Sequence, residues 1–270
     1  MSRAPLTVVA LGGNALLRRG QPLTADNQER AARHAARLLA EVSGEHRLVV
    51  THGNGPQVGL LALLAENYTE VAPYPLDVLD AESEGQIGYV LELELDNAID
   101  DQDTVAIITR TLVDAGDPAF DEPTKPIGPV YDEQTAKALA AERGWTVKPD
   151  GSSYRRVVAS PDPKRIVQLP AIEHLVEAGF LVVCTGGGGI PVVDDGHGGH
   201  RGVEAVIDKD LASAVLAIDL GADHLVLATD VDSVRRDFGT PDERRIASAT
   251  PAGLRALGLD AGSMGPKAEA

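Results

Sequence analysis

Apolar runs typical of buried strands alternate along this chain with segments of helical periodicity, and this alternation limits the possible folds more than any other feature. The predicted strands are Leu6–Leu11, Arg47–Thr51, Thr104–Thr109, Phe180–Thr185 and His224–Thr229. The predicted helices are Gln28–Val42, Gln57–Asn67, Gly85–Ile99, Pro170–Ala178, Asp208–Leu220 and Pro251–Leu257. Strands separated by helices form βαβ units with parallel strands and helices on both faces. We therefore predict an open α/β/α sandwich with a mostly parallel central sheet.

The first predicted helix shows the periodicity most clearly. Its apolar residues fall on one helical face, and they are Ala31, Ala35, Leu38, Leu39 and Val42. Asp26 is followed three residues later by Glu29, a spacing typical of a capping box. We expect Asp26 to be the N-cap of this helix.

One segment interrupts the alternation. Seven of the seventeen prolines lie between Pro118 and Pro163, which argues against central sheet strands there. The same segment has one helical stretch, Glu133–Arg143, and aromatic residues to bury, including Trp145. Within a single domain of residues 1–270, we therefore expect residues 116–164, approximately, to form a small proline-rich subdomain that protrudes like a lid. We also expect it to move during the reaction cycle.

Charge and cysteine content narrow the classes of partner. The formal net charge is −17, and such a field repels nucleic acid and anionic membrane surfaces. The sequence lacks a run of about 18 apolar residues, which a membrane-spanning helix requires. Cys184 is the single cysteine, so an intramolecular disulfide framework is excluded. We expect a cytoplasmic protein that binds small molecules.

Glycine-rich turns follow three of the predicted strands. ALGGNAL contains Gly12, Gly13 and Asn14, THGNGPQVG contains Gly53, Asn54 and Gly55, and TGGGGIPV contains the run Gly186–Gly189 with Gly187 and Gly188 at its centre. The carboxyl ends of parallel strands meet at one edge, where such folds bind ligands. Glycine allows backbone N–H groups to converge on an anion. The three turns therefore predict a phosphate cradle, although none matches a P-loop or a dinucleotide-binding fingerprint.

Three lysines have unusual neighbours. Lys125 lies in PTKPIGP, Lys209 lies between Asp208 and Asp210 at a predicted helix start, and Lys267 lies in GSMGPK. A lysine is ordinarily a solvated surface charge, but rigid glycine or proline neighbours favour a positioned cation. Phosphoryl transfer depends on positioned positive charge more than on covalent chemistry.

The motifs ALGGNAL, THGNGPQVG, PTKPIGP, RRVVASP, TGGGGIPV, GVEAVIDKDLASA, TDVD and GSMGPK occur in this order between about Val8 and Lys267. This series resembles the carbamate kinases, a branch of the amino-acid kinase family. The resemblance implies an open α/β sandwich with a protruding subdomain. It implies a homodimer that transfers a phosphoryl group reversibly between carbamoyl phosphate and ADP, giving ATP and carbamate. It also implies that Mg²⁺ arrives with the nucleotide, and that the reaction serves arginine metabolism.

The resemblance also implies roles for the motif residues. The first two glycine turns would hold the transferring phosphoryl and carbamoyl groups, with Gly187 and Gly188 in the same phosphate site. Lys125 would reach this group from the insert, while Lys209, oriented by Asp210, would bridge the donor and acceptor phosphates. The adenine would lie beside Asp230 and Val231, and the segment with Met264, Gly265 and Lys267 would close over the nucleotide phosphates.

Two departures from the family pattern stand out. Family members usually have Gln-Gly before IGY, whereas this chain has Glu84-Gly85 in DAESEGQIGY, so the extra carboxylate either faces solvent or alters the substrate side. The chain also ends at Ala270, where the family continues with a helix and further strands, so we expect a truncated or naturally short chain.

Other interpretations remain open. The stretch DDGHGGH is expected to be a surface loop, not a metal site, because no distal ligand set accompanies it. A kinase acting on another small acid would be separated from a carbamate kinase by a substrate panel. A non-catalytic nucleotide-binding regulatory protein would be separated from both by turnover measurements.

Overall fold

A sheet of five parallel strands forms the centre of the protein in a computed structural model, which describes residues 3–17, 21–68, 70–229, 231, 233–259 and 264–270. The strand order is β12 (His224–Ala228), β1 (Leu6–Leu11), β2 (Arg47–His52), β9 (Leu181–Val183) and β3 (Thr104–Ala106). Each adjacent pair is parallel, so the predicted mostly parallel central sheet is confirmed.

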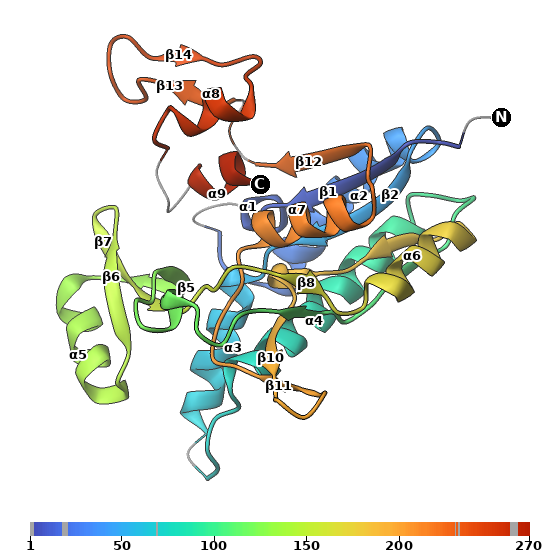
Figure 1. Ribbon diagram of the computed structural model, residues 1–270. Helices are drawn as coiled ribbons and strands as arrows, with labels where there is room; N and C mark the ends of the chain where they lie inside the picture. Colours follow the sequence, from blue (N-terminus) through green and yellow to red (C-terminus); the bar gives the residue numbers. More distant parts are fainter. Residues whose placement is uncertain (1–2, 18–20, 69, 230, 232, 260–263) are drawn as a thin grey trace.

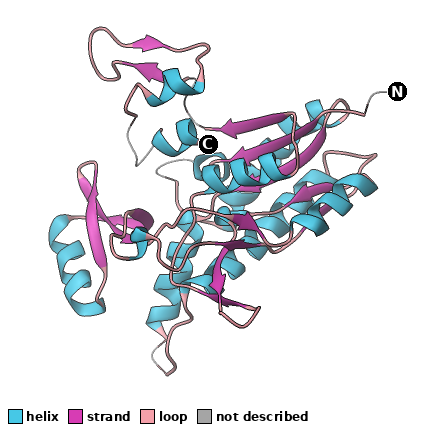
Figure 2. Ribbon diagram, in the orientation of Figure 1, coloured by secondary structure: helices cyan, strands magenta, loops and turns pink. Residues whose placement is uncertain are grey.

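Helices cover both faces of this sheet (Figure 2). α2 (Ala25–Ser43) and α4 (Leu76–Asp96) pack on one face, and α6 (Leu169–Ala178) and α7 (Lys209–Asp219) pack on the other. Successive side chains of a strand point to opposite faces. Val9 of β1 accordingly joins the first core, while Val8 joins the second. The predicted three-layer α/β/α sandwich is therefore confirmed.

A second, mixed sheet was not predicted. Its strands are β11 (His200–Gly202), β10 (Ile190–Asp194), β4 (Arg110–Leu112) and β8 (Arg165–Ile166). They have two to five residues each, too few for alternation to be recognised. The stretch DDGHGGH forms the exposed tip of the β10–β11 hairpin, as expected for a surface loop.

The proline-rich segment folds outside both sheets and protrudes from the body (Figure 1). It contains the antiparallel strands β5 (Lys125–Tyr131), β7 (Ser153–Val158) and β6 (Thr146–Asp150), with α5 (Glu133–Arg143) beside them. Its base lies on helix α3 (Gly55–Asn67). A Cβ atom at Gly59 would lie 2.0 Å from the Cα of Gly128, so the backbones of α3 and β5 are in direct contact.

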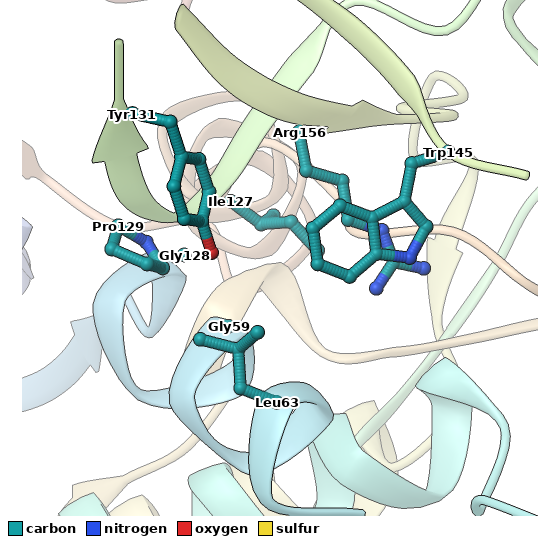
Figure 3. Close-up of a pocket in the computed structure, with 8 residues that line it drawn as sticks. All are labelled: Gly59, Leu63, Ile127, Gly128, Pro129, Tyr131, Trp145 and Arg156. Atoms are coloured by element: carbon teal, nitrogen blue, oxygen red, sulfur yellow. The ribbon is translucent and has the colours of Figure 1, made fainter. Parts of the chain in front are cut away.

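A cluster of polar side chains fastens the same junction. Glu66 of α3 accepts hydrogen bonds from Arg143 (2.5 Å), Trp145 (3.2 Å) and Arg156 (3.4 Å). The two guanidinium groups lie 5.2 Å and 4.8 Å from the centre of the Trp145 ring, within the range of cation–π attraction. Figure 3 shows Trp145 and Arg156 beside Gly59 and Gly128 in the small pocket at this junction.

The remaining elements are short. They are α1 (Gly13–Leu16), η1 (Pro118–Phe120), η2 (Gly186–Gly188), β13 (Arg235–Arg236), β14 (Arg244–Arg245), α8 (Pro251–Arg255) and α9 (Gly265–Glu269). α9 packs against α7, which brings the last described residues back to the main sheet. None of the described helices is both long and apolar enough to cross a membrane.

Two expectations about helix α2 were wrong. Its N-cap is Thr24, whose hydroxyl accepts a hydrogen bond from the Asn27 amide, so Asp26 lies inside the first turn. Leu38 and Val42 are 52% and 41% exposed, because the buried stripe, which includes Ala32 and Ala36, is rotated from the predicted face.

Helix α4 also differs from its prediction. It starts at Leu76, following Pro75 as N-cap, and not near Gly85. The acidic side chains of its first half obscured the apolar periodicity, although two of them, Asp80 and Glu84, are buried.

Candidate active site

The three glycine turns lie side by side, because β1, β2 and β9 are neighbours and run in parallel. The Gly53 amide donates to the Leu11 carbonyl at 3.0 Å. A Cβ atom at Gly53 would lie 3.4 Å from both the Gly13 nitrogen and the Cδ atom of Lys209. The first two turns and the stem of Lys209 therefore meet at one point on the carboxyl edge of the sheet.

The four-glycine run owes its composition to close packing and to its backbone conformation. Gly187, Gly188 and Gly189 have φ values of 66°, 95° and 84°, a region that side chains disfavour. A Cβ atom at Gly187 would lie 2.2 Å from the Asn54 side chain, and one at Gly188 would lie 2.9 Å from Ile207. The run is thus wedged between the second glycine turn and the residue that precedes Asp208.

Two aspartates gather the three predicted lysines at the start of α7. Asp208 is the N-cap of this helix, and its carboxylate accepts a 2.6 Å hydrogen bond from Lys125. The carboxylate of Asp210 accepts from its neighbour Lys209 and, at 2.9 Å, from Lys267. Residues from the insert, from α7 and from α9 therefore converge on one helix terminus.

Burial and pairing act in opposite directions on these charges. Burial lowers the pKa of Lys209, while the adjacent Asp210 carboxylate favours its protonated form. For Asp208, burial alone would raise the pKa, but the Lys125 ammonium and the amides of the α7 terminus hold it below its usual value. The ionic cluster at this terminus is thus partly desolvated, and in such surroundings an electrostatic interaction is stronger than in water.

The side chain of Asn54 points into α4. Its amide nitrogen donates to Asp80 at 2.9 Å and to Ser83 at 2.8 Å. Both amide protons are therefore engaged, and a ligand at this turn would meet backbone N–H groups in preference to the Asn54 amide. A phosphate-binding role for Asn54 therefore stays a prediction for its backbone N–H group and not for its side chain.

Two buried carboxyl groups of α4 accept hydrogen bonds from residues of the glycine turns. Glu84 is only 3% exposed, so of the two alternatives for this carboxylate the solvent-facing one is wrong. Burial raises its pKa to about 7. Burial also raises the pKa of Asp80 well above its usual value. Sequence reasoning missed Asp80, although a signal was present: Asp80 and Glu84 lie four residues apart on the same helical face as Leu76 and Ile87.

The residues predicted to border the nucleotide are Asp230, Val231, Met264, Gly265 and Lys267. Asp230 lies outside the described residues, and so does the side chain of Asn14. Val231 is 46% exposed, and Met264 is the half-buried N-cap of α9, followed by Gly265. Among the described residues, the hydrogen bonds and ion pairs join Lys267 to the lysine cluster but do not reach Val231. The predicted adenine pocket stays a prediction.

Comparisons with known proteins agree on one family. A model of the amino acid kinase family matches residues 5–270. A carbamate kinase from Haemophilus influenzae is 51% identical over 264 residues, covering 97% of this chain and 85% of its own length. A second, from Rhizobium meliloti, is 52% identical over 267 residues and covers 97% and 82%.

A solved structure is similar over nearly the same range. The carbamate kinase from Giardia lamblia bound to citric acid has a TM-score of 0.91 at 38% identity, covering 99% of this chain and 88% of that one. The chain therefore belongs to the amino acid kinase family, within its carbamate kinase branch.

Proposed function

We propose that this enzyme transfers a phosphoryl group reversibly between carbamoyl phosphate and ADP, giving ATP and carbamate. The observation that carries the proposal is the convergence of Lys125, Lys209 and Lys267 beside glycine turns at the carboxyl edge of the sheet. The relatives described above, at about 50% identity over nearly the whole chain, favour this activity over a kinase for another small acid or a non-catalytic regulator.

In the direction of ATP formation, a β-phosphate oxygen of ADP attacks the phosphorus of carbamoyl phosphate. The bond between that phosphorus and the carbamoyl oxygen breaks, and carbamate leaves with the electron pair. Carbamate is an anion as it leaves, so the step requires no strong general acid. The protein's task is then to hold the two reactants in line and to compensate negative charge on the phosphoryl oxygens.

The lysines are suited to that task. Lys209, whose stem lies beside Gly53, would contact the transferring group, and Asp210 would orient it. Lys125 would approach the same group from the insert, and Lys267 would contact the nucleotide phosphates from α9. At an effective dielectric constant of 20, unit charges 4 Å apart interact by about 4 kcal/mol. Each ~1.4 kcal/mol by which such interactions lower the activation free energy accelerates the reaction tenfold.

Mg²⁺ fits this site as a companion of the nucleotide. Within the described ranges, no group of three or more His, Cys, Asp or Glu side chains is placed to hold a metal ion. The nearby carboxylates of Asp208 and Asp210 are paired with lysines. We therefore propose that nucleotide phosphates supply most of the ligands, and that the ion neutralises part of their charge. Adenine would then lie near Asp230 and Val231.

We also propose a cytoplasmic homodimer that serves arginine metabolism. Helices α2, α3 and α4 expose apolar side chains to a degree that favours a protein contact. These side chains are Leu38, Leu64, Tyr89 and Leu93, with Tyr68 directly after the end of α3. Light scattering coupled to gel filtration tests the assembly, and a mass near that of one 28.3 kDa chain would contradict it.

The activity is tested by coupling ATP formation from carbamoyl phosphate and Mg-ADP to a luciferase readout. Lys209→Ala should abolish turnover, whereas Lys148→Ala, at an exposed lysine of the insert, should leave it unchanged. ADP binding is measured alongside by calorimetry. Binding of ADP without turnover in the wild-type chain would overturn the proposal.

A further inference from the structure

The buried carboxylate of Glu84 accepts three hydrogen bonds from two different segments. Its Oε2 accepts from the Thr109 amide at 3.1 Å, and its Oε1 accepts from the Thr109 hydroxyl at 2.5 Å and from the Gly186 amide at 2.8 Å. The Thr185 amide donates to the Thr109 hydroxyl at 2.6 Å, so the hydroxyl proton is directed to Glu84. One side chain of α4 thus ties the loop after β3 to the first residue of the glycine run.

The glycine run lies between the two parts of the candidate active site. Gly187 packs against Asn54 at the head of α3, and Gly188 packs against Ile207, just before the lysine-bearing terminus of α7. We propose that Glu84 is a positioning residue that sets the distance between the second glycine turn and Lys209 by holding Gly186 in place. This inference rests on the proposed function, in which both the second glycine turn and Lys209 would contact the transferring group.

An ionised carboxylate suits this position, and an amide does not. All three groups that face Glu84 are donors, and two of them are backbone N–H groups that cannot reverse. A glutamine would offer one acceptor oxygen and one NH₂ group. In either orientation of that amide, the N–H of Thr109 or of Gly186 would face another donor and lose its acceptor.

Of the titratable groups in this region, Glu84 is the one whose pKa lies near neutrality. His52 of β2, Asp80 of α4 and Cys184 after β9 are the other titratable groups around it. Burial lowers the pKa of His52 to about 4, raises the pKa of Cys184 to about 12, and keeps Asp80 protonated well above its usual range. The pKa of Glu84, raised by burial and lowered by its three donors, is about 7.

The test compares kcat between pH 5.5 and 8.5 in the wild type, Glu84→Gln, Thr109→Val and the matched control Glu82→Gln, an exposed acid of the same helix. Amide hydrogen exchange of residues 184–190 is measured on the same samples. At pH 8, Glu84→Gln should lower kcat on the order of tenfold, with KM for ADP changed less than twofold, and should speed exchange in the glycine run. In the wild type, kcat should fall as the pH drops below about 7, where Glu84 becomes protonated; we call this fall the acid limb. Glu84→Gln should abolish the acid limb, while Glu82→Gln follows the wild type.

Thr109→Val gives a second reading that does not depend on the folding of the glutamine variant. It removes a donor to the carboxylate and should move the acid limb to higher pH. An acid limb that stays in place in both variants, or hydrogen exchange of residues 184–190 that Glu84→Gln leaves unchanged, would overturn the proposal. If the wild type forms no ATP, the proposed function fails, and hydrogen exchange alone then decides whether Glu84 holds the run.

Discussion

Replacing Gly59 by alanine tests how the insert is attached to the body. The added Cβ atom would lie 2.0 Å from the Gly128 Cα and 2.1 Å from its nitrogen. Because carbon atoms pack at about 3.5–4.0 Å, the two backbones must separate by roughly 1.5 Å. Overpacking of this kind costs about 1–3 kcal/mol. Removal of a glycine from a helix returns about 0.5–1 kcal/mol, so we expect a net loss of stability.

Gly85→Ala is the matched control. Gly85 also lies inside a helix, but a Cβ atom there would have no neighbour within 4 Å. This variant should gain about 0.5–1 kcal/mol. With a conversion of about 2–4 °C per kcal/mol for a chain of this size, the two melting temperatures should move in opposite directions.

Thermal unfolding followed by circular dichroism measures this difference, and tryptophan emission reports on the junction. Trp145 lines the same pocket as Gly59 and Gly128, so its emission should change in Gly59→Ala and remain constant in Gly85→Ala. Lys125 lies three residues before Gly128, so kcat should also fall. Equal stabilisation by both alanines would refute the direct contact between α3 and β5.

Four further predictions concern pH and local contacts. Burial raises the folded-state pKa of Glu84 from 4.5 to about 7. The free energy of unfolding of the wild type should therefore fall by about 3 kcal/mol between these two pH values, compared with that of Glu84→Gln. Urea unfolding at a series of pH values measures this difference. Burial of His52 lowers its pKa from 6.5 to about 4. The stability contributed by its neutral ring is therefore fully present above pH 6.5 and is lost as the pH falls toward 4, and His52→Gln should reduce that loss of stability. Glu66→Gln should cost about 1–2 kcal/mol, because one carboxylate serves three donors, and the emission of the single tryptophan should shift with it. Thr24→Ala should cost about 1 kcal/mol and Asp26→Ala less, as chemical unfolding would show.

Sequence patterns predicted the central sheet well, because long buried strands such as Leu6–Leu11 leave a continuous run of mostly apolar residues with β-branched residues at its centre. They were less successful with α4, where Asp80 and Glu84 occupy positions that pack inward. The spacing of Asp80 and Glu84 places both on the apolar face of the helix, but the partners that make a buried carboxylate tolerable do not show in the local sequence. Those of Glu84 are up to 102 residues away in the chain. Tertiary contacts, not local propensity, decide such positions.

For the candidate site, motif spacing led to the lysines but not to their partners. The flanking aspartates were visible beside Lys209, yet the sequence held no sign that Asp208 would pair with Lys125, 83 residues away. The glycine run was interpreted as a phosphate cradle. Its close contacts with Asn54 and Ile207 provide a structural reason for the glycines that is independent of any ligand.

The pairing of lysines with aspartates also affects the electrostatic field that an approaching ligand meets. Three ammonium groups face two carboxylates, within a chain whose formal net charge is −17. At low ionic strength, where the Debye length grows to about 30 Å at 0.01 M salt, an approaching phosphate anion therefore meets net repulsion. Electrostatic steering, which speeds the association of many enzymes with their anions, is reversed here. Added salt should accelerate the encounter by screening that repulsion, and the attraction of the lysines begins only when the ligand has reached the sheet edge.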